Sequence, residues 1–465
     1  MAAKHGERGV LVMRIVQAAA WIAALWSLTT IAQAQGTASL AITHVNVVDV
    51  VDGHIDSDRT VIIQDGNIER VDGGSPPANA RIVDAKGKYL IPGLWDMHAH
   101  TGGPTPTPAL ERFQAKWLEL YVLNGVTGIR DMGSELEIIL KLRAGTASGA
   151  ILGPRIFTAG PILDDAPGDW PLRLRVKTAA DGRAAVQMLK AKGVDLIKVH
   201  DHTPREAFFA IADEARRQHL PLAGHRPLAV KMQEVLDAGQ GDIEHLDNNR
   251  LWFPCSGGKE YHPDSCKDFF AMLARRQIWQ TPTLVAFAEV ATLGTQDSQL
   301  SEEELAYASK PIRNGWALNQ STFITPANRA QVVQDSRTGA RTAAIVTRDL
   351  ANAGVPILTG CDFMIAGFCV HDELHALVSG GMTPLAALQS ATLAPARYLK
   401  VDETLGSIAP GKRADLVLLD ANPLQDIANT RRIRAVLLGG RFLDRSEIDR
   451  RLAQVRSAAK ATEHD

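Results

Sequence analysis

The sequence predicts an α/β protein: a (β/α)8 TIM barrel joined to a small β-sandwich domain that both chain ends build. Through the middle of the chain, short apolar runs alternate with helical periodicity, which is typical of βα units around a parallel sheet. The two flanks are strand-like instead, and polar residues stand where the central apolar runs end. A chain of 465 residues has room for a barrel and a second, smaller unit.

The N-terminal residues differ from the rest of the chain. Basic residues precede an apolar stretch, Ile15–Ile31, which closes on Ala32-Gln-Ala34. This order is typical of a cleavable secretory signal, so we predict a signal peptide over residues 1–34. A membrane anchor is the alternative, but the stretch contains polar residues and is short for a full span. We therefore expect a periplasmic or secreted protein that does not contact the membrane after signal cleavage.

Net charge and cysteine content limit the kind of binding partner and the kind of cellular compartment that suit the chain. The formal net charge is −2 and no basic cluster is present, so the sequence gives no support for nucleic-acid binding. Four cysteines fit the oxidising compartment that export would provide. Two local disulfides, Cys255–Cys266 and Cys361–Cys369, are the economical pairing. Four cysteines allow three connectivities, however, and free buried thiols are the alternative.

The chain divides into a central segment and two β-rich flanks. Strand-like runs with turns at Gly53 and Asp65-Gly66 occupy residues 36–88, and the same pattern returns over residues 400–445. We expect these flanks to form one small β-sandwich domain, with the barrel over residues 89–399. Residues 446–465 form a C-terminal tail, which we expect to be a charged, exposed helix or a frayed end.

Eight candidate strands make up the central segment. They cover residues 91–97, 125–131, 155–159, 194–200, 220–225, 242–245, 277–284 and 355–360. Helical patterns lie between them, such as the one that Pro204 opens and that continues to His219. In a TIM barrel the catalytic residues lie at the C-terminal ends of the strands.

Metal-type ligands follow several of these strands. His98 and His100 end the first strand and share one face, because successive strand side chains alternate. The further strand-end residues are Lys198 and His200 on the fourth strand, His225 on the fifth, His245 on the sixth and Asp362 on the eighth. Each alone could be a core histidine, an ion-paired lysine or a turn carboxylate. Together they favour a metal site at one end of the barrel.

These segments resemble the metal-dependent amidohydrolase superfamily, and within it the imidazolonepropionase-like branch that includes Xaa-Pro dipeptidase-like enzymes. The resemblance runs from about Ile42 to Leu443. Its carriers are Ile91-Pro-Gly-Leu-Trp-Asp-Met-His-Ala-His100, Gly125-Val-Thr-Gly-Ile-Arg-Asp-Met-Gly133, Ile197-Lys198-Val199, Gly224-His225, Ile243-Glu-His245, Thr359-Gly-Cys-Asp362 and Leu405-Gly-Ser-Ile-Ala-Pro-Gly-Lys-Arg-Ala-Asp-Leu-Val417.

The resemblance implies a centre with two divalent metal ions, zinc being the first candidate. It implies that the more buried ion is held by His98, His100 and Asp362, that the other is held by His225 and His245, and that Lys198, carbamylated by CO2, bridges the two. A mononuclear site with a purely structural Lys198 is the alternative, and manganese or cobalt would suit the same ligands.

The resemblance also implies hydrolysis of a C–N bond in an amide, dipeptide or N-acyl amino acid. A metal-bridged hydroxide would attack the carbonyl, and Asp362 would carry the proton to the leaving amine. A lactone, ester or cyclic-amide hydrolase would use the same site, and a non-catalytic metal-binding scaffold is a third reading. His200 stands where branch members often carry a tyrosine that is suspected of binding the carbonyl oxygen; it would be catalytic there or would only support the ligands.

Specificity is expected in the loops that follow the strands. The candidate substrate-binding residues are Arg226, Trp170 and His371, in a site for a small molecule with a hydrolysable carbonyl. Arg226 could instead anchor its loop through an ion pair. Trp252 and Trp316 could line the site or pack their own loops. Homo-oligomer formation stays open.

Overall fold

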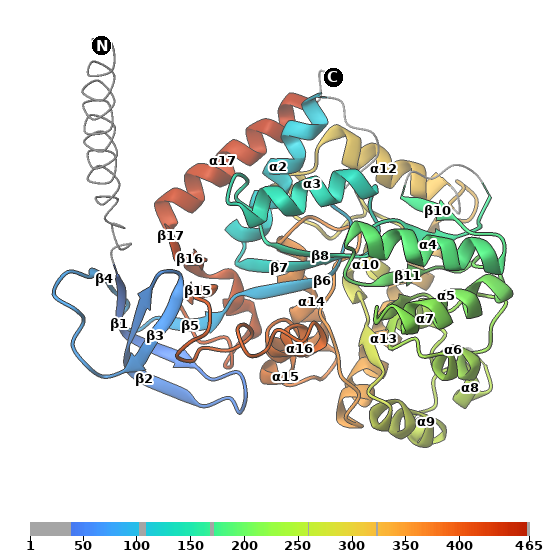
Figure 1. Ribbon diagram of the computed structural model, residues 1–465, viewed down its shortest axis with the longest axis horizontal. Coiled ribbons are helices and arrows are strands. Elements are labelled where there is room, and N and C mark those ends of the chain that lie inside the picture. Colours follow the sequence, from blue (N-terminus) through green and yellow to red (C-terminus); the bar gives the residue numbers. More distant parts are fainter. Residues whose placement is uncertain (1–38, 102–107, 168–171, 259, 322–323, 463–465) are drawn as a thin grey trace, which may run out of the picture.

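The computed structural model describes residues 39–101, 108–167, 172–258, 260–321 and 324–462 (Figure 1). The architecture is TIM-barrel-like, an α/β fold with parallel central strands and a separate mixed sheet outside them. The predicted signal peptide lies outside the described residues. Within the described ranges, no helix combines the length and the apolar character that crossing a membrane requires.

Two parallel sheets form the centre of the molecule. The first contains β6 (Leu94–Ala99), β7 (Val126–Asp131) and β8 (Arg155–Thr158) in that order. The second runs in the order β10 (Arg173–Arg175), β9 (Ile162–Asp164), β11 (Ile197–Val199), β12 (Leu222–Gly224), β13 (Asp242–Glu244) and β14 (Trp279–Thr281). The strand-like runs predicted between residues 91 and 284 are therefore confirmed as strands, most of them shorter than predicted.

The predicted eighth strand lies between the two sheets and forms only isolated bridges. Ile357 bridges Gln280 of β14 in parallel, and Asp362 bridges Ala99 of β6 in parallel. Between these points the amide of Met97 donates to the carbonyl of Thr359 at 2.8 Å. The backbone of this segment thus links β14 to β6 and brings Asp362 beside the end of the first central strand.

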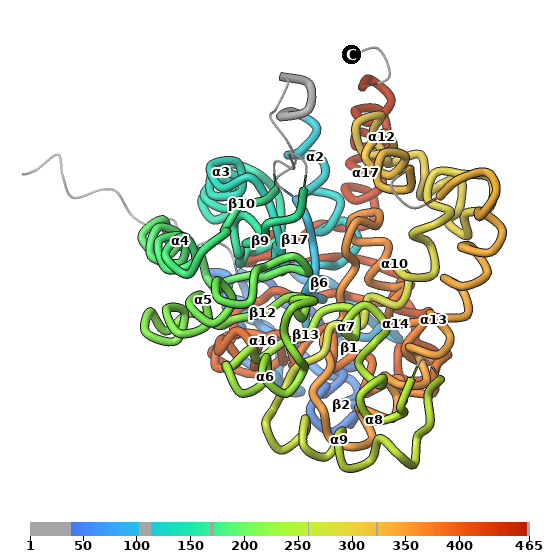
Figure 2. Tube along the Cα trace, turned by 90° about the vertical axis from the view of Figure 1, so that its right-hand side faces the viewer, coloured from blue at the N-terminus to red at the C-terminus, as the bar shows by residue number. Residues whose placement is uncertain are grey.

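Helices surround the central strands, with α4 and α5 on one side and α13 on the opposite side (Figure 2). The helices are α2 (Pro108–Leu123), α3 (Leu136–Ala147), α4 (Ala179–Lys192), α5 (Arg205–Arg217), α6 (Met232–Ala238), α7 (His245–Asn249), α8 (Phe253–Ser256), α9 (Pro263–Arg275), α10 (Leu284–Glu289), α11 (Glu302–Leu305), α12 (Lys310–Ser321), α13 (Arg329–Asn352), α14 (Phe368–Ser379), α15 (Pro384–Ser390), α16 (Leu393–Tyr398), α17 (Arg445–Ala461) and the 3-10 helix η1 (Ile427–Arg431).

Helices α4 and α5 show how sequence sets these elements. A reciprocal capping box between Thr178 and Asp181 starts α4, and Gly193 ends it with a left-handed φ of 82°. In α5 the side chains of Phe208 and Ile211 lie buried on one helical face, as the 3.6-residue period predicts. The apolar face binds the helix to the sheet, while its charged face stays in water.

The two β-rich flanks of the chain meet in one eight-stranded sheet. Its strands are β1 (Leu40–Val48), β2 (Ile55–Gln64), β3 (Asn67–Asp72), β4 (Arg81–Asp84), β5 (Tyr89–Pro92), β15 (Leu416–Leu419), β16 (Ile433–Leu438) and β17 (Arg441–Asp444). Val417 of β15 pairs antiparallel with Ile91 of β5, which joins the two flanks. Residues 89–92 therefore belong to this sheet and not to the central strands, because the apolar run before the Pro-Gly pair is a separate strand.

The C-terminal helix α17 is packed, so the expectation of an exposed or frayed tail is wrong. Its residues Ile448, Val455 and Ala459 are buried. Arg451 forms an ion pair with Glu119 of α2. The charged residues that suggested exposure lie on the other faces of an amphipathic helix.

Ile448→Ala should lower the free energy of unfolding by about 2–5 kcal/mol, because Ile448 is fully buried and truncation leaves a cavity. Gln454→Ala on the exposed face of the same helix should change it by less than about 0.5 kcal/mol. Urea unfolding of both variants tests this. Equal stability of the two variants would show that α17 is not packed in solution.

Candidate metal centre

The predicted ligand residues meet at the C-terminal ends of the central strands. The Nε2 atom of His100 lies 3.2 Å from Oδ1 of Asp362, and the Nε2 atom of His98 lies 3.6 Å from the same oxygen. The Nζ atom of Lys198 lies 3.1 Å from Nε2 of His98. His245 completes this group, since its Nε2 lies 3.9 Å from Oδ2 of Asp362. Side chains at the ends of β6 and β11, at the start of α7 directly after β13, and on the bridging segment thus lie close together.

The outer nitrogens of three histidines are held by the protein. The pairs are His98 Nδ1 with Glu244 Oε2 at 2.5 Å, His100 Nδ1 with the carbonyl of Gly133 at 2.7 Å, and His245 Nδ1 with Thr283 Oγ1 at 2.6 Å. In each pair Nδ1 makes the hydrogen bond, so the Nε2 atom of each ring faces Asp362. Metal-binding histidines are commonly oriented by such a bond from the second ring nitrogen.

Burial favours the neutral form of His98, His225 and His245. It lowers the pKa of His98 and of His225 well below the usual value, and neighbouring Lys198 and His245 lower both further. Burial also lowers the pKa of His245 to about 4, although Asp362 opposes this change. Neutral imidazole is the form that binds a metal ion.

Lys198 and Asp362 are shifted in ways that suit a metal centre. Burial lowers the pKa of Lys198, although Glu244 and Asp362 oppose the change. Burial would raise the pKa of Asp362, but the neighbouring imidazoles of His100 and His245 outweigh it and hold this pKa below the usual range. At neutral pH Asp362 is therefore a carboxylate, the form that coordinates a metal.

A second group of possible ligands lies beside the first. It consists of His200, Asp201 and His225, whose donor atoms lie within 4.8 Å of one another. The rings of His200 and His225 stack with centroids 3.9 Å apart. His225 Nδ1 lies 3.3 Å from Asp201, and the ring of His225 meets that of His245 edge-on with centroids 4.9 Å apart. The predicted residues for a second ion are therefore neighbours, with Asp201 as an addition that the sequence reading missed.

These residues fit a divalent metal ion. His98, His100 and Asp362 offer two imidazole nitrogens and a carboxylate oxygen within 4.8 Å of one another. Oδ1 of Asp362 is buried and accepts no hydrogen bond of good geometry from the described residues. Such a set of nitrogen and oxygen donors suits zinc and related transition metals.

Comparison with known proteins decides the family. Residues 89–443 match the model of the Amidohydrolase family. The chain belongs to the amidohydrolase family. Ochratoxinase of Aspergillus niger is 25% identical over 399 residues, covering 73% of this chain and 71% of the relative. This amidohydrolase is thus a hydrolase that acts on carbon–nitrogen bonds, and its family is generally metal-dependent.

Solved structures support the same assignment and its Xaa-Pro dipeptidase-like branch. A prolidase candidate from Bifidobacterium longum aligns with a TM-score of 0.69 and 25% identity, covering 90% of this chain and 99% of that one. A bottromycin amidohydrolase aligns with a TM-score of 0.70 at 24% identity, covering 90% of each chain. This second likeness shows the shared fold.

A buried arginine supports the ligands of this amidohydrolase, and the sequence reading missed it. Arg130 of β7 forms ion pairs across the interior with Asp242 and Glu244 of β13. Its Nε donates to the carbonyl of Met97 at 2.6 Å, directly before His98. Burial opposes ionisation of Arg130, but the charges of Glu244 and Asp242 dominate and raise its pKa. Arg130 therefore fixes Glu244, which in turn orients His98.

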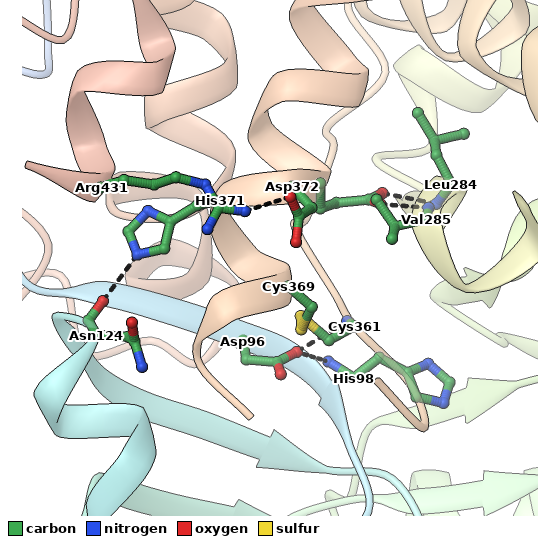
Figure 3. Close-up of a disulfide and its surroundings, with 11 residues drawn as sticks. Asp96, His98, Asn124, Leu284, Val285, Cys361, Cys369, His371, Asp372 and Arg431 are labelled. Atoms are coloured by element: carbon green, nitrogen blue, oxygen red, sulfur yellow. Dashed lines mark hydrogen bonds and ion pairs between the residues drawn. A yellow bond between two sulfur atoms is a disulfide. The ribbon is translucent and has the colours of Figure 1, made fainter. Parts of the chain in front are cut away.

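Two of the predicted substrate-binding residues have other contacts: His371 lies away from the candidate ligands, and Arg226 forms an ion pair. His371 was expected to face the site, which is wrong: one ring nitrogen contacts Thr430 Oγ1 at 3.0 Å. The other contacts the carbonyl of Asn124, also at 3.0 Å (Figure 3). Asn124 precedes β7, so His371 lies at the opposite strand end from the ligands. Arg226 pairs with Asp247 at 2.9 Å, which is the loop-anchoring alternative.

The loop aromatics pack their own loops. Trp252 and Trp316 are both buried, so the alternative of loop packing holds for each. The indole Nε1 of Trp316 donates to the carbonyl of Phe363 at 2.9 Å, which ties α12 to the residue after Asp362. Trp170 lies outside the described residues.

Both predicted disulfides are confirmed, and one of them encloses a candidate ligand. The Cys361–Cys369 disulfide (Figure 3) closes a short loop, and Asp362 is the first residue of that loop after Cys361. Oδ1 of Asp96 accepts from the amides of His98 at 3.1 Å and Cys361 at 3.0 Å. One carboxylate thus joins the backbone of β6 to the disulfide loop, so that His98 and Asp362 keep their relative positions.

Removing the Cys361–Cys369 disulfide with two serines should weaken metal binding about 10- to 100-fold, the range found when groups that orient ligands are lost. The matched control replaces Cys255 and Cys266, whose disulfide encloses no ligand. Both double variants should lose a similar amount of stability, about 2–4 kcal/mol, since the two loops are similar in length. Chelator competition measures the metal affinity.

An unchanged metal affinity in the Cys361/Cys369 variant, with the stability loss present, would contradict a role of this disulfide in holding Asp362. An equal loss of affinity in both variants would assign the effect to general destabilisation.

Proposed function

We propose that this amidohydrolase is an exported, binuclear metal-dependent hydrolase that cleaves the amide bond of a dipeptide or N-acyl amino acid. The observation that carries the proposal is the convergence of His98, His100, His245, Lys198 and Asp362, with the outer nitrogens of the three histidines anchored. The prolidase and ochratoxinase relatives support an amide as the substrate.

Each predicted ligand has a place in this proposal. His98, His100 and Asp362 would hold one ion, and His225 and His245 would hold the other, with zinc as the first candidate. When bound, such ions lower the pKa of a water molecule and polarise a carbonyl group. The strands themselves would form a closed barrel beside a β-sandwich, an arrangement that gathers all these residues at one end.

Lys198 would carry a carbamate that bridges the two ions. A free amine adds to CO2 with release of one proton, so the lowered pKa of Lys198 favours the reactive form. An ammonium group at this position would repel two cations, whereas a carbamate adds a negative charge. Its position 3.1 Å from His98 Nε2 supports this role.

Proton transfer in this proposal belongs to Asp362. The carboxylate is ionised at neutral pH and lies among the ligand nitrogens, so it can take the proton of the attacking water and pass it to the leaving nitrogen. His200, stacked on His225 beside the centre, would donate to the oxyanion that develops on the carbonyl. Burial lowers the pKa of His200, and His225 and Lys198 lower it further, which favours the neutral tautomer as a weak donor.

Export rests on the predicted signal peptide and on the two disulfides. Disulfides persist in secreted and periplasmic proteins, where thiols are not kept reduced. N-terminal sequencing of protein recovered from outside the cytoplasm should begin close to residue 35.

Asp362→Asn should lower kcat for an amide substrate about 10²- to 10⁴-fold, because the amide side chain cannot accept the proton. The test uses zinc-, manganese- and cobalt-reconstituted protein on a panel of Xaa-Pro dipeptides and N-acyl amino acids, with lactones and esters in parallel. Asp297→Asn, an exposed carboxylate remote from the ligands, is the control.

Full turnover by Asp362→Asn would refute the proton-transfer role. Turnover of lactones alone would favour the ester-type alternative, and a metal-loaded protein without any hydrolysis would support a non-catalytic scaffold. Metal analysis that finds one ion in the fully active protein would replace the binuclear centre with a mononuclear one.

A further inference from the structure

Phe363 is a large aromatic side chain that the fold leaves open to solvent beside the metal ligands. It is 39% exposed, and it is the one aromatic residue among the well-exposed large hydrophobic residues of the described chain. The others in that group are not aromatic, and an exposed apolar residue is by itself ordinary on a protein surface. Phe363 differs because it directly follows Asp362.

The fold restrains Phe363 before any ligand binds. Its ring stacks on the ring of His100, with centroids 4.4 Å apart and the planes inclined by 6°. Its carbonyl accepts from the buried indole of Trp316 at 2.9 Å. It also lies inside the loop that Cys361–Cys369 closes. A side chain fixed in this way loses little conformational entropy when a ligand packs on it.

A second aromatic ring borders the centre. Phe287 of α10 meets the ring of His245 edge-on, with centroids 6.1 Å apart. Phe287 is half-buried, whereas Phe363 stacks on His100 and is still 39% exposed. The surroundings of the ligand histidines are therefore apolar on two sides, and Phe363 offers the open surface.

We propose that Phe363 is a specificity-determining residue that binds an aromatic or large apolar side chain of the leaving amino acid. The inference rests on the proposed function. Asp362 would protonate the leaving nitrogen, so the substituents of that nitrogen lie within reach of the next residue in the chain. An aromatic side chain there would stack on Phe363 as His100 does on its other face.

The test compares two phosphonamidates that imitate the tetrahedral intermediate, N-methylphosphonyl-L-phenylalanine and N-methylphosphonyl-L-alanine. Calorimetry on the metal-reconstituted full chain should show that the phenylalanine compound binds roughly 5- to 30-fold more tightly. Phe363→Ala should abolish this preference, and Phe363→Tyr should keep it. Leu318→Ala, an exposed apolar residue on α12 near Trp316, should leave the preference unchanged.

The outcomes separate the two proposals. Equal binding of both compounds by the parent protein, or a preference that survives Phe363→Ala, would overturn the role of Phe363. An equal loss of both ligands together with a loss of bound metal would overturn it too, since Phe363 would then only support His100. Failure of the parent protein to bind either compound would instead contradict the proposed amide hydrolysis.

A turnover series places the subsite on one side of the scissile bond. Phe363→Ala should lower kcat/KM roughly 5- to 30-fold more for N-acetyl-phenylalanine than for N-acetyl-alanine, mainly through KM. N-benzoyl-alanine and N-acetyl-alanine, which differ on the acyl side, should respond equally. A selective loss of N-benzoyl-alanine hydrolysis would overturn the assignment to the leaving group.

Discussion

The ion pairs of Arg130 with Asp242 and Glu244 are the constraint on which the centre depends. An unpaired charge in this dry interior would be strongly unfavourable, so the three residues must be placed together. Glu244 then has one oxygen on Arg130 and the other on Nδ1 of His98. The tautomer of His98, and with it the nitrogen available to a metal, follows from a charge pair made across the strands. The Arg130 guanidinium also packs over Tyr398, with its central carbon 4.9 Å from the ring centroid.

Backbone conformation at the strand ends provides the second half of this placement. Asp362, Thr283 and His245 all have left-handed φ values, between 50° and 59°. The left-handed run continues from His245 through Asn249, at a cost of roughly 1–2 kcal/mol for each residue. Strain of this kind persists only where surrounding contacts fix it, and it concentrates at functional sites. Asp247 pairs here with Arg226, which gives that arginine a structural reason for its position.

Residues at the strand ends could be predicted from the sequence, because they follow from strand periodicity. The ion pairs that cross between strands could not. His98 and Lys198 could be placed because a polar residue that ends an apolar run is visible in one dimension. Arg130 could not, because a charge inside a strand shows its function only when its partners on β13 are known. The prediction for His371 was wrong for a related reason: helix periodicity does not tell which end of the strands a helix residue reaches. The short length of the eighth segment was also hidden, since its pairing depends on two distant neighbours.

The two halves of the centre are therefore held by different means. His98 and His100 extend from a fully buried strand, and their outer nitrogens are bonded to neighbouring strands and loops. Asp362 has only an isolated bridge, and its position depends on Asp96 and the Cys361–Cys369 disulfide. Because a disulfide limits the alternative conformations of a short loop, it can replace the missing strand pairing. The same loop presents Phe363, so the restraint that positions Asp362 also fixes the surface that we propose for substrate binding.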